Sequence, residues 1–211
     1  MAEYKLYAFG ESGNSYKAAL MLALTGSAWE LVPVDYFNGE TRGAAFRDTV
    51  NAMGEAPVLV HKGRTLSQSG VILDYLAEQT GQFGPQNDDE RREILRWTLF
   101  DNHKFTSYYA TLRFLVGLQK SGESQVTEFL RARAKGAFAI VDKHLAGRDF
   151  MLGTRPTIAD ISLAGYIFFK EETGLALTDY PHILAWRERI AALPGWQAPY
   201  DLVPRAPKAK G

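Results

Sequence analysis

The residues with the clearest chemical meaning lie between positions 56 and 72, where a strand led by a proline, a turn and a helix start follow one another. Pro57 opens a short apolar run, and proline is tolerated at the first residue or the edge of a strand, where the backbone is left unpaired. The hydroxyls of Ser67 and Ser69 can accept hydrogen bonds from the first amides of the helix, and such a helix start favours a carboxylate. Free backbone beside an anion seat predicts a site for a small peptide that carries its own carboxylates.

The chain has no cysteine. Disulfides, thiolate metal sites, cysteine nucleophiles and Cys-x-x-Cys redox motifs are therefore excluded, and any thiol chemistry must use a thiol that the ligand brings. The four histidines lie far apart in the sequence and show no i, i+4 pairing of the kind that metal ligands on a helix adopt, so we expect no metal site. They are His61, His103, His144 and His182.

The composition is that of an ordinary globular protein. The 211 residues fit one large or two small domains, and a hydrophobic content of 46% is enough for a real core. Because 24 basic and 24 acidic residues cancel, the charge indicates neither nucleic acid nor an anionic membrane as a partner. The first residues lack the apolar core of a signal peptide, and no run approaches the ~18 apolar residues of a membrane span. We expect a cytoplasmic protein.

The elements that must position the 56–72 segment alternate between strand and helix. The pattern predicts a strand over 4–7, a helix over 15–24, a strand over 29–34 and a short helix over 43–50. The two strands and the helix of the opening segment follow. Alternating strands and helices indicate a sheet with helices packed on it, and the last two strands should form a hairpin.

The pattern changes after residue 80. Residues 81–88 are rich in Gly, Pro and polar side chains and are predicted to be a linker. Everything beyond is predicted to be helical, over 89–118, 123–146, 157–173 and 181–193. The sequence therefore predicts a mixed domain over 1–80, an all-helical domain over 89–203 and a frayed tail over 204–211.

Thr157 and Asp160 open one of these helices as a capping box, in which a hydroxyl and an acid three residues later satisfy the first amides. Such a cap stabilises a helix by about 1 kcal/mol. We predict that Asp160 is a folding device and not a catalytic acid.

Taken together, these features resemble the glutathione S-transferase superfamily, in its serine-type or Asn-loop bacterial classes. Residues 51–59 resemble the family segment around its cis-proline, residues 66–69 its carboxylate-binding turn, and residues 156–160 its C-terminal capping box. The resemblance covers nearly the whole chain. It implies an α/β thioredoxin-like N-terminal domain plus an all-α C-terminal helical domain, and usually a homodimer.

The resemblance also implies how glutathione would bind. Pro57 would be cis, and the backbone of Ala56 would pair with the cysteinyl unit, which is strand addition by a tripeptide. Gln68 and Ser69 would hold the γ-glutamyl end, with the helix start favouring its α-carboxylate. Simple helix capping is the alternative role of Ser69, and the two roles are compatible.

The catalytic group must favour the thiolate, which is the nucleophilic form of a thiol, by donating a hydrogen bond to sulfur. The family places this donor just after its first strand, which implies Ser12, with Asn14 as the alternative. Ser15 is expected to be the N-cap of the first helix. Tyr7 is expected to belong to the core.

Some residues depart from the family pattern. Glu55 stands where a Lys or Gln often reaches the glycyl carboxylate, so we expect Arg42 or Lys17 to do that work. Gln68 replaces an acid, which weakens the grip on the γ-glutamyl ammonium unless another carboxylate helps. Asp101 resembles an acid that some classes contribute across a dimer interface, and the alternative is a solvated helix residue.

The second substrate would lie against the long helix over 89–118. Tyr108, Tyr109 and Arg113 share one broad face of it and are the expected substrate-binding residues, although an aromatic stripe is also typical of a core.

The resemblance implies a glutathione transferase that activates glutathione, as co-substrate, for attack on a small hydrophobic electrophile, without a metal. The alternatives are a glutathione-dependent isomerase, a disulfide reductase, or a non-catalytic binding module of the same fold.

Overall fold

A computed structural model describes residues 2–170 and 173–205. The chain divides into two compact units: Met1–Gln82 together with Pro194–Gly211, and Phe83–Leu193. The sequence pattern predicts a helical domain that extends to residue 203, but the structure groups the residues from Pro194 onward with the first unit. Of the predicted tail over 204–211, the residues from 206 lie outside the described part of the chain.

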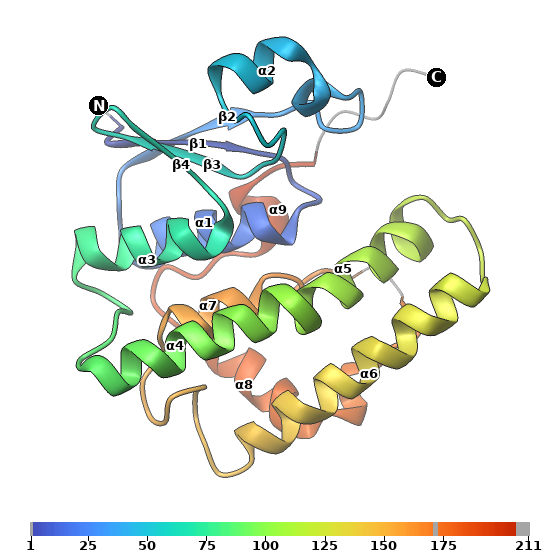
Figure 1. The fold of residues 1–211 in the computed structure, drawn as a ribbon. Coiled ribbons are helices and arrows are strands. Elements are labelled where there is room, and N and C mark those ends of the chain that lie inside the picture. Colours follow the sequence, from blue (N-terminus) through green and yellow to red (C-terminus); the bar gives the residue numbers. More distant parts are fainter. Residues whose placement is uncertain (1, 171–172, 206–211) are drawn as a thin grey trace. The chain divides into compact units, whose positions relative to one another are not determined.

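The first unit is built on a four-stranded sheet in the order β2-β1-β3-β4 (Figure 1). Strand β1 pairs in parallel with β2 and antiparallel with β3. The predicted hairpin is present, because β3 and β4 pair antiparallel across Lys62 and Gly63, which both have the positive φ that a tight two-residue turn uses. The strands are β1 (Tyr4–Ala8), β2 (Trp29–Pro33), β3 (Val58–His61) and β4 (Arg64–Ser67).

Helices cover both faces of this sheet. In Figure 1, α1 and α3 lie on one side and α2 on the other. Helix α1 ends at Leu24, and Gly26, two residues later, has the positive φ of a left-handed helix exit. The first-unit helices are α1 (Gly13–Leu24), α2 (Ala44–Thr49), α3 (Ser69–Thr80) and α9 (Pro199–Leu202). At four residues, α9 is too short to show a helical period, and the sequence analysis missed it.

Contacts with the start of α1 explain why the C-terminal segment belongs to this unit. The hydroxyl of Tyr16 donates a hydrogen bond of 2.8 Å to the Gln197 carbonyl. A Cβ added to Gly10 would lie 2.3 Å from the Pro204 carbonyl oxygen, so only glycine permits this close approach. The loop after β1 is therefore held against the end of the chain.

The second unit is all helical. The predicted long helix is helical from Asp88 to Leu118, with π-helical turns at Asp101–Phe105 and Phe114–Leu118. The helix predicted over 157–173 ends earlier, at Ala164, where Gly165 caps it. Residues 171–172 of that prediction lie outside the described residues. The helices are α4 (Asp88–Phe100), α5 (Thr106–Arg113), α6 (Gln125–Leu145), α7 (Ile158–Ala164) and α8 (Pro181–Ala191).

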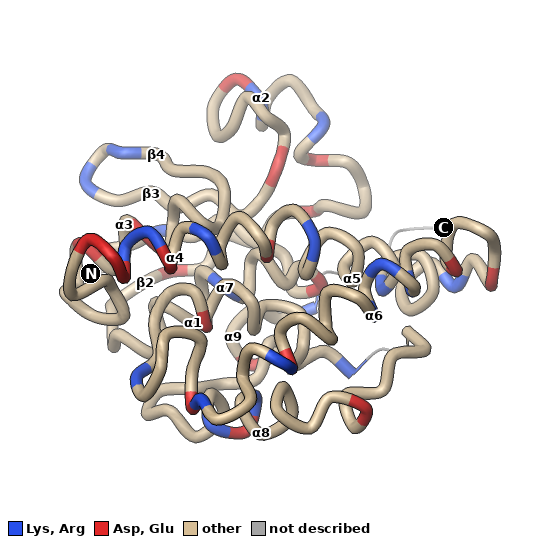
Figure 2. Tube along the Cα trace, turned by 60° about the horizontal axis from the view of Figure 1, so that its bottom comes forward, with Lys and Arg blue, Asp and Glu red and all other residues tan. Residues whose placement is uncertain are grey.

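Helix ends in this unit follow elementary electrostatics. Asn87 caps α4, and its side chain accepts from the Glu90 amide at 2.9 Å. The first turn of α4 carries three acids, seen as the red start of this helix in Figure 2, which suits the positive end of a helix dipole. Thr157 and Asp160 form the predicted capping box of α7. None of the helices in the described ranges has the length and apolar character that a membrane crossing would require.

Candidate functional site

Ser12 stands at the start of α1, as its N-cap. Its backbone is extended, and its Oγ accepts a hydrogen bond from the Ser15 amide at 3.1 Å. The expectation that Ser15 caps this helix is wrong, because Ser15 lies inside α1, fully buried, with its Oγ accepting from the Phe9 amide. The capping bond uses Ser12 as an acceptor and leaves its hydroxyl hydrogen available for donation.

Asn14 and Ser69 meet although 55 residues separate them. The Ser69 hydroxyl donates to Asn14 Oδ1 at 3.3 Å. Ser69 is the first residue of α3, so this bond joins the N-terminal ends of α1 and α3, which pack together in the first unit. Helix N-termini carry partial positive charge and unpaired amides, and both features favour an anion. Two predicted site residues from different segments are thus brought to one place.

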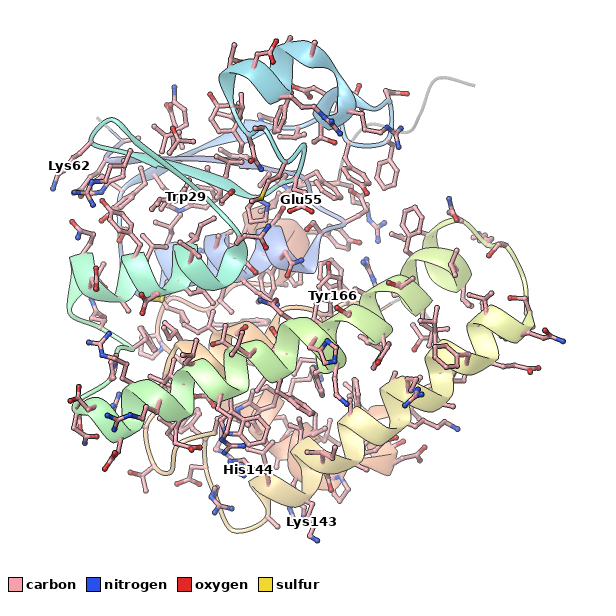
Figure 3. The ribbon with its side chains drawn as sticks, viewed as in Figure 1. Trp29, Glu55, Lys62, Lys143, His144 and Tyr166 are labelled. Atoms are coloured by element: carbon pink, nitrogen blue, oxygen red, sulfur yellow. The ribbon has the colours of Figure 1, made fainter. Side chains whose placement is uncertain are left out.

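Gln68 precedes α3 in an unusual backbone conformation. Its φ of 69° lies in the region that favours glycine and that costs another residue about 1–3 kcal/mol. Its side-chain Nε2 donates to Glu55 Oε2 at 2.7 Å. Figure 3 labels Glu55 in the loop ahead of β3. The entry to α3 is therefore tied to this loop through Gln68 and Glu55.

The Ala56–Pro57 peptide bond is cis. Strand β3 begins one residue later, at Val58, which pairs with Tyr7 and Ser67 on either side. Within the described residues, neither the amide nor the carbonyl of Ala56 belongs to the sheet ladder or to another backbone hydrogen bond. The unpaired backbone expected at this point of the sequence is thus present.

The two cations expected at the glycyl end differ in exposure. Lys17 is fully buried in α1, so we leave it out of the proposed site. Arg42 is exposed and ends the 3-10 turn Glu40–Arg42. Sequence reasoning missed Arg47, whose guanidinium lies beside the loop before β3: a Cβ added to Gly54 would be 2.9 Å from Arg47 Nε. Its only sequence signal is a basic residue within a predicted helix.

An aromatic cluster near Ser12 was also missed. Phe9 stacks on Tyr36 with ring centroids 4.3 Å apart and meets Phe37 edge-on at 6.1 Å. All three are half-buried, so they offer apolar surface. Tyr7, by contrast, packs against the buried cluster that includes Val34, which agrees with the core role expected of it.

Asp101 lies in the interior of the second unit. It is fully buried, and its carboxylate accepts hydrogen bonds from the hydroxyls of Thr106 and Ser162, the latter at 2.6 Å. A carboxylate held in this way links α7 to the π-helical turn that follows α4. It is neither solvated nor presented to a ligand, so we leave Asp101 out of the proposed glutathione site.

Two of the three expected substrate-binding residues are core residues of the second unit. Tyr109 is 5% exposed, with its ring 5.1 Å from that of Phe138. Arg113 is 1% exposed, and its guanidinium lies 4.0 Å over the ring of Phe169. Tyr108 is half-buried and is the one of the three that keeps surface for a ligand.

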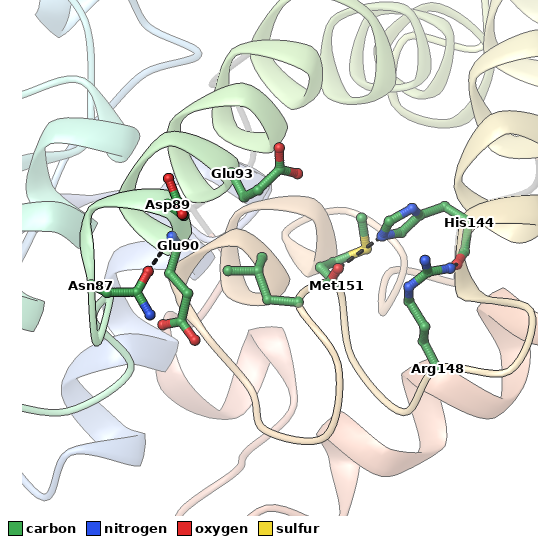
Figure 4. A pocket seen from close by; sticks show the side chains of 8 residues that line it. Asn87, Asp89, Glu90, Glu93, His144, Arg148 and Met151 are labelled. Carbon is green, nitrogen blue, oxygen red and sulfur yellow. Dashed lines mark hydrogen bonds between the residues drawn. The ribbon is translucent and has the colours of Figure 1, made fainter.

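A pocket of about 430 Å³ opens in the second unit between the start of α4, the end of α6 and the loop after it (Figure 4). Its carboxylates are paired with arginines, as Glu90 is with Arg155 and Glu93 with Arg96. Burial lowers the pKa of His144, whose Nε2 lies 2.8 Å from the Met151 carbonyl. Nowhere in the described ranges do three or more His, Asp or Glu side chains gather as a metal site would require. These charged and polar groups of the pocket lining are therefore already paired with other groups of the protein.

Comparison with known proteins places this chain and its fold in a family. The family model described as "Glutathione S-transferase, N-terminal domain" matches residues 2–78, and the corresponding C-terminal domain matches residues 105–194. The maleylacetoacetate isomerase of Pseudomonas aeruginosa is 28% identical over 201 residues, which cover 92% of this chain and 93% of that protein. The crystal structure of a glutathione S-transferase from Pseudomonas fluorescens is 33% identical, with a TM-score of 0.88 over 94% of this chain and 99% of the other. A possible glutathione S-transferase from Rhodopseudomonas palustris is 34% identical, with a TM-score of 0.86 over 98% and 93%. The chain belongs to the glutathione S-transferase superfamily.

Proposed function

We propose that this protein binds glutathione in its first unit and activates the thiol for attack on a small hydrophobic electrophile. The observation that carries the proposal is the hydrogen bond between Asn14 and Ser69, which joins the starts of α1 and α3. The N-termini of α1 and α3, the hydroxyl of Ser69 and the amide of Asn14 would then face one anionic tripeptide. Ser12 caps α1.

Docking would use the backbone. The unpaired amide and carbonyl of Ala56 are suited to pairing with the cysteinyl unit, because a peptide that adds to a sheet edge is positioned by main-chain hydrogen bonds. The start of α3 would receive the γ-glutamyl carboxylate, with the backbone amide of Ser69 as a donor. Arg47 and Arg42 are the candidate partners of the glycyl carboxylate.

The chemistry would be stabilisation of the thiolate. A hydroxyl that donates to sulfur favours the charged form and lowers the pKa of the thiol, so a larger fraction is nucleophilic at neutral pH. Ser12 is the proposed donor and Asn14 the alternative. The apolar surface of Phe9, Tyr36 and Phe37 would favour a hydrophobic second substrate. Tyr108 stays the predicted substrate contact within the second unit. Neither a metal nor a covalent enzyme intermediate is needed.

The test separates binding from activation. Titration calorimetry measures the glutathione affinity of Ser12→Ala and Asn14→Ala, and ultraviolet absorbance measures the thiolate fraction of the bound peptide. We expect Ser12→Ala to bind glutathione within a few-fold of wild type but to lose about 10²-fold in rate with a nitro-activated aryl chloride. Since Ser12 also caps α1, thermal unfolding is followed in parallel, and Ser121→Ala, at an exposed serine, is the matched control.

Each result assigns a role. If Asn14→Ala loses the thiolate signal while Ser12→Ala keeps it, Asn14 is the donor. If wild type does not bind glutathione at millimolar concentration, the proposal fails and a non-catalytic module of this fold becomes the better interpretation.

A glutathione-dependent isomerase is the second candidate function, because the relative from Pseudomonas aeruginosa that is 28% identical is named a maleylacetoacetate isomerase. An isomerase regenerates its thiol, a transferase consumes it, and a disulfide reductase oxidises it. Measuring reduced and oxidised glutathione before and after turnover, with a maleyl ketone, an aryl halide and a small disulfide as substrates, therefore distinguishes the three reactions.

We also propose a homodimer. Helix α4 exposes Leu95 and Leu99, which are 56% and 59% accessible and lie one turn apart on the same face. Paired exposed leucines of this kind support association with a second copy. Sedimentation velocity of wild type and of a Leu95→Lys variant tests it. A cytoplasmic location stays a prediction of the sequence.

A further inference from the structure

The loop before β3 carries a carboxylate, that of Glu55, which is bonded to the residue that precedes α3. The Glu55 side chain is turned toward Gln68, whose Nε2 donates to Glu55 Oε2 at 2.7 Å. Both side chains are exposed, so the carboxylate remains accessible to a ligand. Within the described residues, Glu55 forms no ion pair with a lysine or arginine of the chain.

The backbone of Glu55 is held in place by the loop before β3. The Asn51 side-chain amide donates to the Glu55 carbonyl at 2.9 Å, and its Oδ1 accepts from the Met53 amide at 3.1 Å. Gln68 holds the side-chain end of Glu55, and it does so from a positive φ, which is uncommon for residues other than glycine. Glu55 is therefore held both at its backbone carbonyl and at its side-chain carboxylate.

The γ-glutamyl end of glutathione is a free α-amino acid, with an ammonium and a carboxylate on one carbon. A binding site for such a zwitterion needs hydrogen-bond donors for the carboxylate and, within a few ångströms, a negatively charged acceptor for the ammonium. The backbone amides at the start of α3, that of Ser69 included, supply the donors. Gln68 is neutral, so the negative charge must come from another residue, and Glu55 is its direct hydrogen-bond partner.

We propose that Glu55 binds the α-ammonium of the γ-glutamyl group and that Gln68 positions its carboxylate for this contact. This inference rests on the proposed glutathione site and concerns which residue recognises its amino end. The site would then select peptides with a free α-amino group, through a charge placed in the loop before β3 instead of at the helix entrance.

The test combines a change in the protein with a change in the ligand. Titration calorimetry compares glutathione with glutaryl-cysteinyl-glycine, which lacks only the α-ammonium. For wild type we expect glutathione to bind roughly three- to tenfold more tightly, as for an exposed charge pair, and this preference should shrink in high salt. In Glu55→Gln the preference should disappear through weaker binding of glutathione alone, while the affinity for the analogue stays the same.

Two variants complete the design. The double variant Glu55→Gln with Gln68→Glu keeps the hydrogen-bonded pair and moves the charge across it, so the preference should return. Glu78→Gln, the same chemical change at an exposed position of α3, should leave the preference as in wild type. A Glu55→Gln protein that still prefers glutathione to the analogue overturns the inference while leaving the glutathione site intact. A wild type that binds neither peptide refutes the proposed function itself.

Discussion

Replacing Asp160 by alanine should strongly destabilise the second unit, because this one carboxylate satisfies donors from three parts of the chain. It is fully buried. Its Oδ1 accepts from the Met151 amide at 2.8 Å and from Trp186 Nε1 at 2.9 Å. Its Oδ2 accepts from the Thr157 amide at 2.8 Å and from the Thr157 hydroxyl at 3.1 Å. Burial raises the pKa of this carboxyl, and the four donors oppose that effect.

The size of the effect follows from these bonds. In Asp160→Ala three buried N–H groups lose their acceptor, and each unmade bond costs about 1–3 kcal/mol. Removing the carboxylate also removes the cost of burying it, so we expect a net loss of about 3–5 kcal/mol. In Asp160→Asn the amide oxygen can keep Met151 and Trp186 while its NH₂ donates to the Thr157 hydroxyl. One buried N–H, that of Thr157, is then left without an acceptor, so the unfolding free energy should fall by about 1–3 kcal/mol.

Equilibrium unfolding in urea measures both variants, followed by far-ultraviolet circular dichroism and by tryptophan fluorescence, to which Trp186 contributes. Asp89→Ala is the control, because Asp89 is also an acid in the first turn of a helix but its side chain is 95% exposed, and its loss should stay within about 0.5 kcal/mol. The reasoning is refuted if Asp160→Ala unfolds like this control. Equal losses for the asparagine and alanine variants would mean that charge, and not the number of satisfied donors, sets the effect.

Three further outcomes are expected. Gly10→Ala should lower the unfolding free energy, measured in urea, by about 1–3 kcal/mol, because its Cβ would lie 2.3 Å from the Pro204 carbonyl oxygen. An unchanged urea midpoint would contradict this and would mean that the C-terminal segment can shift without cost. Since burial lowers the pKa of His144 from its ordinary value of 6.5, the unfolded chain takes up the proton first, so thermal stability should fall as pH drops below 6.5, and His144→Gln should flatten that dependence. Tyr108→Ala should raise KM for a hydrophobic electrophile at saturating glutathione, whereas Arg113→Met should lower the melting temperature without changing substrate preference, and the reverse pattern would contradict the burial of Arg113.

Local chemistry explains which parts of the fold the sequence predicts well. The proline before Val58 and the Lys62–Gly63 turn each act over a few residues, so the hairpin follows from them. The expectation that a serine hydroxyl caps α3 is wrong, because Gln68 is its N-cap, without a side-chain capping bond, and the Ser69 hydroxyl bonds Asn14 instead. The capping box at Thr157 and Asp160 is equally local, and the structure confirms it. Errors occur where local signals compete: Ser12 and Ser15 are both plausible caps, and the extended backbone of Ser12 decides between them.

Burial and the partners of long-range contacts are decided only by the tertiary structure. Asp101, Tyr109 and Arg113 share a helix with Tyr108, but packing within the second unit buries the first three and leaves Tyr108 partly exposed. A helical period gives the face on which a residue lies, but not what covers that face.

The sequence by itself determined the family, the order of the elements and the docking segment around Pro57, because these depend on residue types at short spacing. Only the folded chain decided that Asn14 meets Ser69, that Lys17 is buried and that Glu55 turns toward Gln68. Those pairings join residues that are distant in sequence, and they form because α1, α3 and the loop before β3 are brought together by packing around one sheet.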